Sequence, residues 1–301
     1  MTNLPKEIRG ILEAQCFISS CEIARRQVSR DGTVKYLFRL RDGETIESVV
    51  MKYEHGRSIC VSSQAGCRMG CVFCASGEHG CARNLLPGEM LAQITEAQND
   101  MGEHISHIVL MGMGEPLDNY DNVLKFIMLV SNPEGLNVSQ RRISLSSCGI
   151  VPKIDQLAKE RLGITLSISL HAANDKLRTQ LMPINRAYPL KELMRACRDY
   201  AAHTSRRISF EYAMLRGIND SASHANELAS LLKGMLCHVN LIPANEMRGV
   251  SRSDKATIQA FQELLTRKGI NCTVRRSLGQ DISAACGQLR SQETGIRNQE
   301  G

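Results

Sequence analysis

The feature that most constrains the fold of this chain is a repeated alternation between short apolar runs and segments with helical periodicity. Seven such runs follow one another at residues 59–62, 107–111, 142–145, 164–170, 208–213, 238–242 and 272–275. The segments between them place apolar residues at helical spacing, as at Leu190, Leu193, Met194, Cys197 and Ala201. Repeated strand–helix units predict a parallel sheet that is covered by helices.

The number of units predicts an α/β fold, a partial (β/α)6 barrel of the TIM type. In such a barrel the active site lies at the mouth formed by the carboxyl ends of the strands. Polar or glycine-rich stretches follow four of the runs, at residues 112–116, 146–149, 169–171 and 243–245. We therefore expect these four stretches to meet at one site.

The first part of the chain has a different pattern. Residues 5–16 predict a short helix, and Asp-Gly turns at 31–32 and 42–43 predict an antiparallel meander. We interpret residues 1–55 as a helix and β-meander extension and residues 56–289 as the barrel core. The polar residues 290–301 predict a disordered tail.

Composition limits the class of protein. No run of about 18 apolar residues is present and the N-terminus lacks a signal-peptide pattern, so we expect a cytoplasmic protein without a membrane partner. In a reducing compartment, the 12 cysteines favour metal binding or catalysis over disulfides. The net charge of +6 permits a polyanionic partner, whereas the 4% aromatic content gives no sign of a base-stacking platform.

Three cysteines, Cys67, Cys71 and Cys74, have the spacing C-x3-C-x2-C. They supply one thiolate fewer than a closed iron–sulfur or zinc site normally takes, so a cluster that they hold leaves one iron open. An open iron can bind a cofactor directly, which indicates redox chemistry. The alternative is a zinc site with Cys60 or Cys81 as fourth ligand, although the spacing differs from the usual C-x2-C of zinc knuckles.

This spacing, followed by strand–helix units, resembles the radical S-adenosylmethionine (SAM) superfamily, in which three cysteines hold a [4Fe–4S] cluster and SAM binds the open iron. Further motifs are Val-Ser-Ser-Gln at 61–64, Gly-Met-Gly-Glu-Pro at 112–116, Ser-Leu-His-Ala at 169–172 and Asp-Ile-Ser-Ala-Ala-Cys-Gly-Gln-Leu at 281–289. Together and in this order they resemble the RlmN/Cfr family, radical SAM methyltransferases that act on adenosine in RNA. The resemblance extends from about residue 45 to residue 289.

The resemblance implies a role for each matching residue. Cys286 matches the methyl-carrying cysteine, Cys60 the second catalytic cysteine and Glu47 the general base. The cluster ligands correspond to Cys67, Cys71 and Cys74. The SAM contacts correspond to Gly114, Glu115, Ser146, Ser169, Leu170, His171 and Asn245. By residue type alone, Glu47 would be a solvated strand carboxylate and Cys286 a structural thiol.

The resemblance also implies a mechanism that consumes two SAM molecules per turnover. Carbons 2 and 8 of adenine are electron-poor, so direct transfer of the SAM methyl group to them is disfavoured. One SAM methylates the thiolate of Cys286, and reductive cleavage of the second yields a radical that activates this methyl group for addition to adenine. Glu47 then removes the ring proton, and Cys60 releases the product by forming a disulfide with Cys286.

The expected target is carbon 2 of an adenosine in 23S rRNA, in tRNA or in both, because Gly-Glu-Pro at 114–116 resembles the carbon-2 enzymes. Alternatives within the family are a carbon-8 enzyme that confers antibiotic resistance and an enzyme that acts on another RNA. We expect a monomer that receives electrons from a donor such as flavodoxin or ferredoxin. Many members carry a longer helical N-terminal domain, and this chain is expected to be a short form without it.

Two readings come from other classes. One is a non-catalytic RNA-binding module with a metal-stabilised loop, and the other is a radical SAM enzyme that activates another protein and does not need Cys286. If the chain binds RNA, four basic pairs are candidates to meet phosphates. They lie at residues 25–26, 141–142, 206–207 and 275–276.

Overall fold

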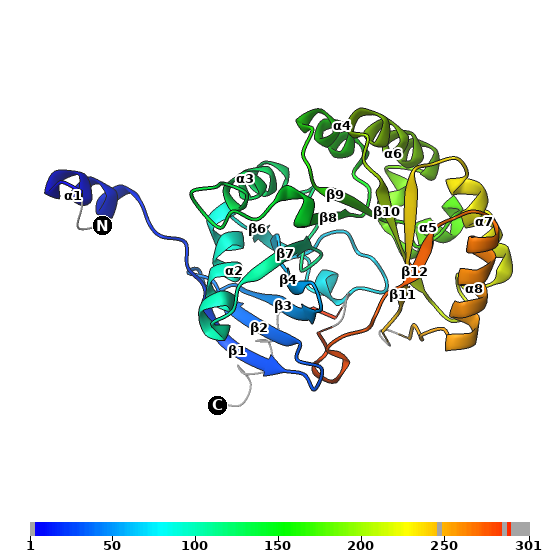
Figure 1. Cartoon of the computed structure of the whole chain (residues 1–301), viewed down its shortest axis with the longest axis horizontal. Coiled ribbons are helices and arrows are strands. Elements are labelled where there is room, and N and C mark those ends of the chain that lie inside the picture. The colour runs from blue at the N-terminus through cyan, green and yellow to red at the C-terminus, as the bar shows by residue number, and fades with distance from the viewer. Residues whose placement is uncertain (1–3, 246–248, 285–287, 290–301) are drawn as a thin grey trace.

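The computed structural model describes residues 4–245, 249–284 and 288–289. Helix α1 (Lys6–Gln15) stands apart from the rest of the molecule (Figure 1). Four antiparallel strands follow as a meander: β1 (Glu22–Val28), β2 (Val34–Arg39), β3 (Thr45–Tyr53) and β4 (Gly56–Cys60). Gly32 and Gly43 have φ values of 82° and 91°, as the predicted Asp-Gly turns require. The predicted tail at 290–301 lies outside the described residues.

Strand β4 also begins the parallel part of a ten-stranded sheet with the order β1-β2-β3-β4-β7-β8-β9-β10-β11-β12. The parallel strands after β4 are β7 (Ile105–Leu110), β8 (Ile143–Ser147), β9 (Thr165–Ser169), β10 (Ile208–Met214), β11 (Cys237–Pro243) and β12 (Cys272–Val274). Each of the seven predicted apolar runs contributes to one parallel strand. This arrangement confirms the predicted partial barrel with a helix and meander extension.

Helices connect successive parallel strands and lie outside the curved sheet (Figure 1). They are α2 (Pro87–Met101), α3 (Tyr120–Val130), α4 (Val151–Glu160), α5 (Asp175–Leu181), α6 (Leu190–Thr204), α7 (Ala222–Leu232) and α8 (Lys255–Arg267). Short 3-10 turns are η1 (Ala75–Gly77), η2 (Gln140–Arg142), η3 (Pro183–Arg186) and η4 (Gln280–Ile282). No helix in the described ranges is both long and apolar enough to cross a membrane.

A large apolar core fills the space between the sheet and its helices. A second apolar cluster includes residues at the carboxyl ends of the strands, among them Cys148, Ala172 and Ala244, and Phe73 packs against it. This second cluster therefore gives the loop that follows β5 (Gln64–Gly66) a firm base at the mouth of the barrel.

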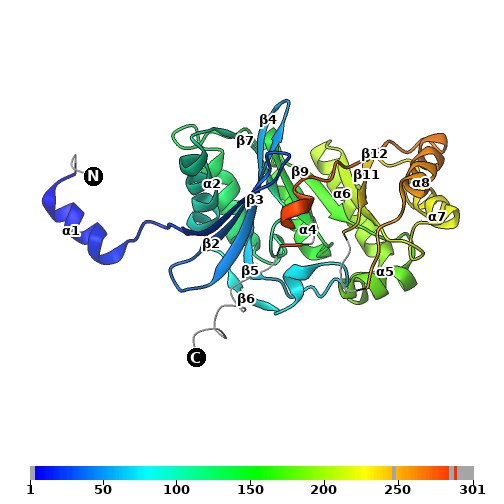
Figure 2. The same ribbon diagram turned by 90° about the horizontal axis from the view of Figure 1, so that it is seen from below.

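Strand β2 is buried on both faces, although its sequence alternates as a half-exposed strand would. One face packs on α2, where the Tyr36 hydroxyl donates to Asp100 over 2.6 Å. The other face is covered by the C-terminal segment, where Lys35 Nζ donates to the carbonyl of Ser283 over 3.4 Å. Figure 2 shows this segment, in red, beside β3.

Candidate active site

The three-cysteine loop is held at its base by a two-stranded sheet of β5 and β6 (Cys81–Asn84). The backbone N–H of Cys67 donates to the carbonyl of Gly80 over 2.8 Å. A Cβ at Gly66 would lie 2.1 Å from that same carbonyl oxygen, and Gly66 has a φ of 88°, so only glycine fits. At its far side the loop is tied to the barrel by the N–H of Val72, which donates to Leu181 over 3.1 Å.

Cys67, Cys71 and Cys74 line one cavity of about 170 Å³. Burial, and after it the negative charge that Cys74 would carry, raise the pKa of Cys67 to about 12. The pKa of Cys71 is raised for the same reasons, burial first and then the charges of Cys74 and Cys67. A cationic group that binds all three thiolates would offset both burial and mutual repulsion.

The donor set fits a polynuclear cluster. Among the described residues, no three Cys, His, Asp or Glu side chains converge on a point where one ion could bind. Each cysteine of an iron–sulfur cluster binds a different iron, so thiols spread around one cavity suit a cluster. Neither Cys60 nor Cys81, the candidate fourth ligands of a zinc site, lines this cavity.

The ends of the parallel strands form the rest of the cavity wall. It contains all but one of the residues predicted to contact SAM, namely Gly114, Glu115, Ser146, Ser169, His171 and Asn245. The exception is Leu170, whose side chain is buried in the main core. Its carbonyl accepts a 3.3 Å hydrogen bond from Arg178, a wholly buried arginine on α5 that also bonds to the carbonyl of Cys148 over 2.7 Å.

Glu115 is fixed in the wall by hydrogen bonds on both sides. Its carboxylate accepts from the backbone N–H groups of Leu117 and Cys148 over 3.0 and 2.7 Å. Burial raises the pKa of Glu115, and these hydrogen bonds oppose the rise. The preceding Gly114 has a φ of 99°, and a Cβ there would lie 2.6 Å from the Cβ of Gln64. Gly114 therefore lets the backbone bring Glu115 to the cavity.

His171 is a neutral hydrogen-bond donor at the end of β9. Burial lowers its pKa to about 3, and its Nδ1 accepts from the N–H of Ala213 over 2.9 Å. In a neutral imidazole the proton is then on Nε2. The ring of Phe73 packs edge-on against His171 with 4.6 Å between centroids, so the cysteine loop and this strand end are in direct contact.

Sequence reasoning missed Glu211 on β10. Its side chain lines the cavity and the residue is 3% exposed. One carboxylate oxygen accepts from Ser209 and Asn240 over 3.2 and 3.0 Å, while the other, Oε2, is buried and has no hydrogen-bond partner within the described structure. A buried acceptor without a donor is costly, so Oε2 favours a ligand that brings a hydroxyl or ammonium group. The available signal was a glutamate inside an apolar strand run.

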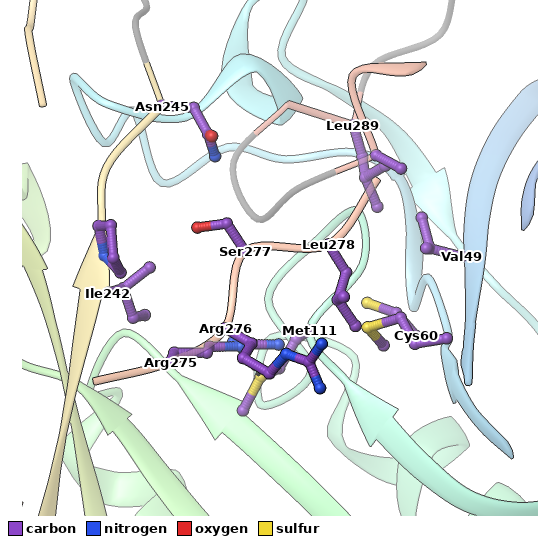
Figure 3. Close-up of a pocket in the computed structure, with 13 residues that line it drawn as sticks. Val49, Cys60, Met111, Ile242, Asn245, Arg275, Arg276, Ser277, Leu278 and Leu289 are labelled. Atoms are coloured by element: carbon purple, nitrogen blue, oxygen red, sulfur yellow. Dashed lines mark hydrogen bonds between the residues drawn. The ribbon is translucent and has the colours of Figure 1, made fainter. Parts of the chain in front are cut away.

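A second, smaller cavity of about 40 Å³ adjoins the first, since both are lined by Met111, Ile242, Asn245 and Arg275. Figure 3 shows Val49 and Cys60 on one side of it and Ile242 on the other. Cys286 lies outside the described residues. The described residues of its segment that line this cavity are Ala284 and Leu289.

Glu47 and Cys60 lie on the same face of the sheet. Val49 of β3 is paired with Cys60 of β4, and Glu47 lies two residues before Val49, so its side chain points to the same side. The Glu47 side chain is 1% exposed and forms an ion pair with Lys35, 3.3 Å between Nζ and Oε1. Residue type alone predicts a solvated carboxylate at Glu47, but the structure buries it. Sequence reasoning missed its partner, Lys35.

Of the four basic pairs, only Arg275 and Arg276 line a cavity of the site. The pairs at 141–142 and 206–207 precede β8 and β10, at the amino ends of the strands and away from the mouth. The Nε of Arg206 donates a 2.8 Å hydrogen bond to the backbone carbonyl of Ile164, so this N–H group is not available to a phosphate. The pair at 25–26 lies on the edge strand β1.

Comparison with known proteins gives consistent matches. Residues 61–228 match the radical SAM superfamily. A probable dual-specificity RNA methyltransferase RlmN from Pelotomaculum thermopropionicum is 56% identical over 294 residues, which cover 96% of this chain and 80% of that protein. A protein of the same name from Clostridium novyi is 53% identical over 293 residues, which cover 96% of this chain and 85% of that protein.

Solved structures agree. The crystal structure of a radical SAM methyltransferase from Sphaerobacter thermophilus superimposes with a TM-score of 0.92 at 46% identity, covering 97% of this chain and 87% of that one. Streptococcus suis SuiB bound to S-adenosylmethionine has a TM-score of 0.55 at 14% identity, and the match covers 73% of this chain and 51% of the SuiB chain. The second likeness concerns the fold alone.

Proposed function

Because the chain belongs to the RlmN family of radical SAM RNA methyltransferases, we propose that it methylates carbon 2 of an adenosine in 23S rRNA, in tRNA or in both. The observation that carries this proposal is the junction of the two cavities. Cys60 lines the smaller cavity, which adjoins the cavity of the three cysteines, and Glu47 lies on the same face of the sheet as Cys60. Both relatives are named as probable dual-specificity RNA methyltransferases, which supports two kinds of RNA substrate.

The family implies a [4Fe–4S] cluster and SAM as cofactors. Cys67, Cys71 and Cys74 would hold the cluster, and the wall residues Glu115 and Glu211 would accept hydrogen bonds from SAM. When bound, these groups supply a methyl group, a carbon radical that removes one hydrogen atom, and an acceptor for one electron. Two SAM molecules are consumed in each turnover, one for the methyl group and one for the radical.

The residues of this chain carry the methyl group to the base. The Cys286 thiolate would attack the methyl carbon of the first SAM, so that a new S–C bond forms, the sulfonium S–CH3 bond breaks and S-adenosylhomocysteine leaves. After loss of one hydrogen atom, the resulting thiomethylene carbon bonds to carbon 2 of adenine. The ring then gives one electron to the acceptor and its carbon-2 proton to the Glu47 carboxylate, which restores aromaticity.

Cys60 completes the reaction. Its thiolate attacks the sulfur of Cys286, the S–S bond forms and the S–CH2 bond breaks. The departing carbon keeps the electron pair and takes up a proton, which yields 2-methyladenosine. A cellular dithiol then reduces the Cys60–Cys286 disulfide. The burial of Cys60 in a cavity walled by Val49 and Met111 supports this scheme, because such a wall keeps water from a carbon radical.

The target base has to leave its stack to reach this junction. Arg275 and Arg276 line the small cavity and would meet the phosphates of a flipped nucleotide. We further propose that the protein acts as a cytoplasmic monomer with flavodoxin or ferredoxin as electron donor. In this scheme residues 56–289 form the radical SAM barrel core, and residues 1–55 form an extension that contributes Glu47.

The test uses the full chain with an assembled cluster and a Cys60→Ala variant, which blocks release. Mass spectrometry of the peptide that carries Cys286 is expected to find a nucleotide attached there, and the attached sequence identifies the RNA. Cys197→Ala, at a buried core cysteine on α6, is the matched control and should trap nothing. An unmodified Cys286 in cluster-loaded protein would contradict the methyl-carrier role. RNA that the wild-type enzyme has methylated is digested with nuclease to nucleosides, and chromatography of these nucleosides separates 2-methyladenosine from the carbon-8 isomer.

A further inference from the structure

Lys35 is a buried lysine close to the proposed reaction centre. Its side chain is 2% exposed, and its ammonium group lies 3.3 Å from Oε1 of Glu47 and 3.4 Å from the carbonyl oxygen of Ser283. Lysine is almost never fully buried unless it is paired. The proposed reaction assigns Lys35 no role, although it contacts both the candidate base and the segment that leads to Cys286.

The strand register explains how Lys35 reaches Glu47. In the β2–β3 pair, Leu37 lies opposite Glu47 and Lys35 opposite Val49, so Lys35 and Glu47 are diagonal neighbours on one face. The neighbouring side chains on the other face, Tyr36 and Ser48, bond to residues of α2. The Lys35–Glu47 pair is therefore turned toward the small cavity, whose wall includes Val49.

The segment that approaches Cys286 is fixed to the same meander by further contacts. Asp281 accepts from the hydroxyl of Ser29 over 2.5 Å and from the N–H of Arg30 over 3.2 Å. Asp31 accepts from the N–H of Gly279 over 2.8 Å. The β1–β2 turn thus holds residues 279–283 in place, and Lys35 bonds to this segment at Ser283.

We propose that Lys35 is a positioning residue for the methyl transfer, one that keeps Glu47 ionised and aimed while it binds the backbone of the Cys286 segment. This inference rests on the proposed function. A buried carboxylate that loses its cationic partner takes up a proton. A protonated Glu47 has no free electron pair of sufficient basicity for the carbon-2 proton, so the reaction would stop at the RNA–Cys286 adduct. Methylation of the Cys286 thiolate does not involve Glu47 and would continue.

The experiment compares Lys35→Met with Lys35→Arg in cluster-loaded, full-length protein. Met has a similar length and no charge, and we expect methylated Cys286, an accumulating RNA adduct and product formation slower by on the order of 100-fold. Arg retains the cation and is expected to recover most of the product. Lys52→Met, at an exposed position on β3, is the matched control and should behave as wild type. The measured quantity is the ratio of RNA–Cys286 adduct to methylated Cys286. A higher ratio in Lys35→Met supports the positioning role, whereas general damage to the fold would lower both species together.

A second measurement does not depend on activity. Glu47→Gln combined with Lys35→Met removes both charges, so the double variant is expected to melt at a higher temperature than Lys35→Met alone. A melting temperature of the double variant equal to or lower than that of Lys35→Met would overturn the pairing.

The two proposals fail in different ways. If Cys60→Ala traps the adduct but Lys35→Met forms product at the wild-type rate, the role of Lys35 is wrong and the proposed function stands. If Cys286 acquires neither a methyl group nor a nucleotide in any variant, the proposed function is wrong. The melting temperatures then still decide whether Lys35 and Glu47 are coupled.

Discussion

The hydroxyl of Ser29 donates a 2.5 Å hydrogen bond to the carboxylate of Asp281, a residue 252 positions further along the chain. This contact joins the first hairpin turn of the meander to the segment that carries Cys286. The pKa of Asp281 is lowered, chiefly by this hydrogen bond and then by the N–H of Arg30. The meander is thus the docking surface for a segment of the proposed catalytic machinery.

Asp281→Ala removes both contacts to the β1–β2 turn and should loosen the docked segment. We expect faster hydrogen exchange at residues 279–284 and a lower rate of RNA methylation by a factor of about ten, because a misplaced reacting group costs rate. The cluster should assemble as in wild type, since Asp281 lies outside the cavity of the three cysteines. Asp155→Ala, at a surface salt bridge with Arg195, is the control. Unchanged hydrogen exchange in Asp281→Ala would contradict the docking role.

Glu211→Gln tests the unpartnered oxygen in the larger cavity. The substitution removes the negative charge and keeps the shape, so binding of SAM should weaken by about tenfold or more, because hydrogen bonds to charged groups contribute about 1.5–3 kcal/mol. Equilibrium dialysis with cluster-loaded protein measures this affinity. The exposed Glu192 on α6 provides the control substitution Glu192→Gln. Unchanged affinity in the Glu211 variant would mean that Oε2 does not face the ligand.

Gly114→Ala tests the close approach beside Glu115. The new Cβ would lie 2.6 Å from Gln64 and 2.8 Å from its backbone nitrogen, at a φ of 99°. Gly234, with a φ of 77° and open space around it, provides a matched control for the conformational cost alone, which is about 1 kcal/mol. We expect Gly114→Ala to lower the free energy of unfolding by more than Gly234→Ala does and to impair SAM binding. Equal losses in urea denaturation would show that the loop adjusts without strain.

The barrel was predictable because its signals are local. Parallel strands buried on both faces read as continuous apolar runs, and each predicted run became a strand, from β4 at Gly56–Cys60 to β12 at Cys272–Val274. The cavity at the strand ends follows from the same topology, and of the predicted SAM contacts Leu170 alone is absent from its wall.

The burial of Lys35 and Glu211 was missed because a charged residue type argues against burial, and the apolar run around Glu211 was its one local signal. Only long-range contacts reverse that expectation. Lys35 is buried by a segment near residue 283, and Glu211 is buried at the centre of the sheet between neighbouring strands. Both are surrounded by parts of the chain that lie far away in sequence, so no local period could indicate their partners.

His171 should make the stability of the protein depend on pH in a defined direction. Its pKa is about 3 in the folded protein and near 6.5 when unfolded, so between these values the unfolded chain binds the extra proton. Stability from this residue is therefore complete above pH 6.5 and is lost as the pH falls, by about 1.4 kcal/mol for each unit well inside the window. Glu115, whose pKa is raised, changes stability with pH in the opposite direction, so the comparison is made against His171→Gln, which keeps Glu115.

Urea denaturation between pH 7 and pH 5 should give a steeper loss of stability for wild type than for the His171→Gln variant. Parallel slopes would show that His171 becomes protonated in the folded protein near its ordinary pKa, and that it is no fixed neutral donor in the cavity.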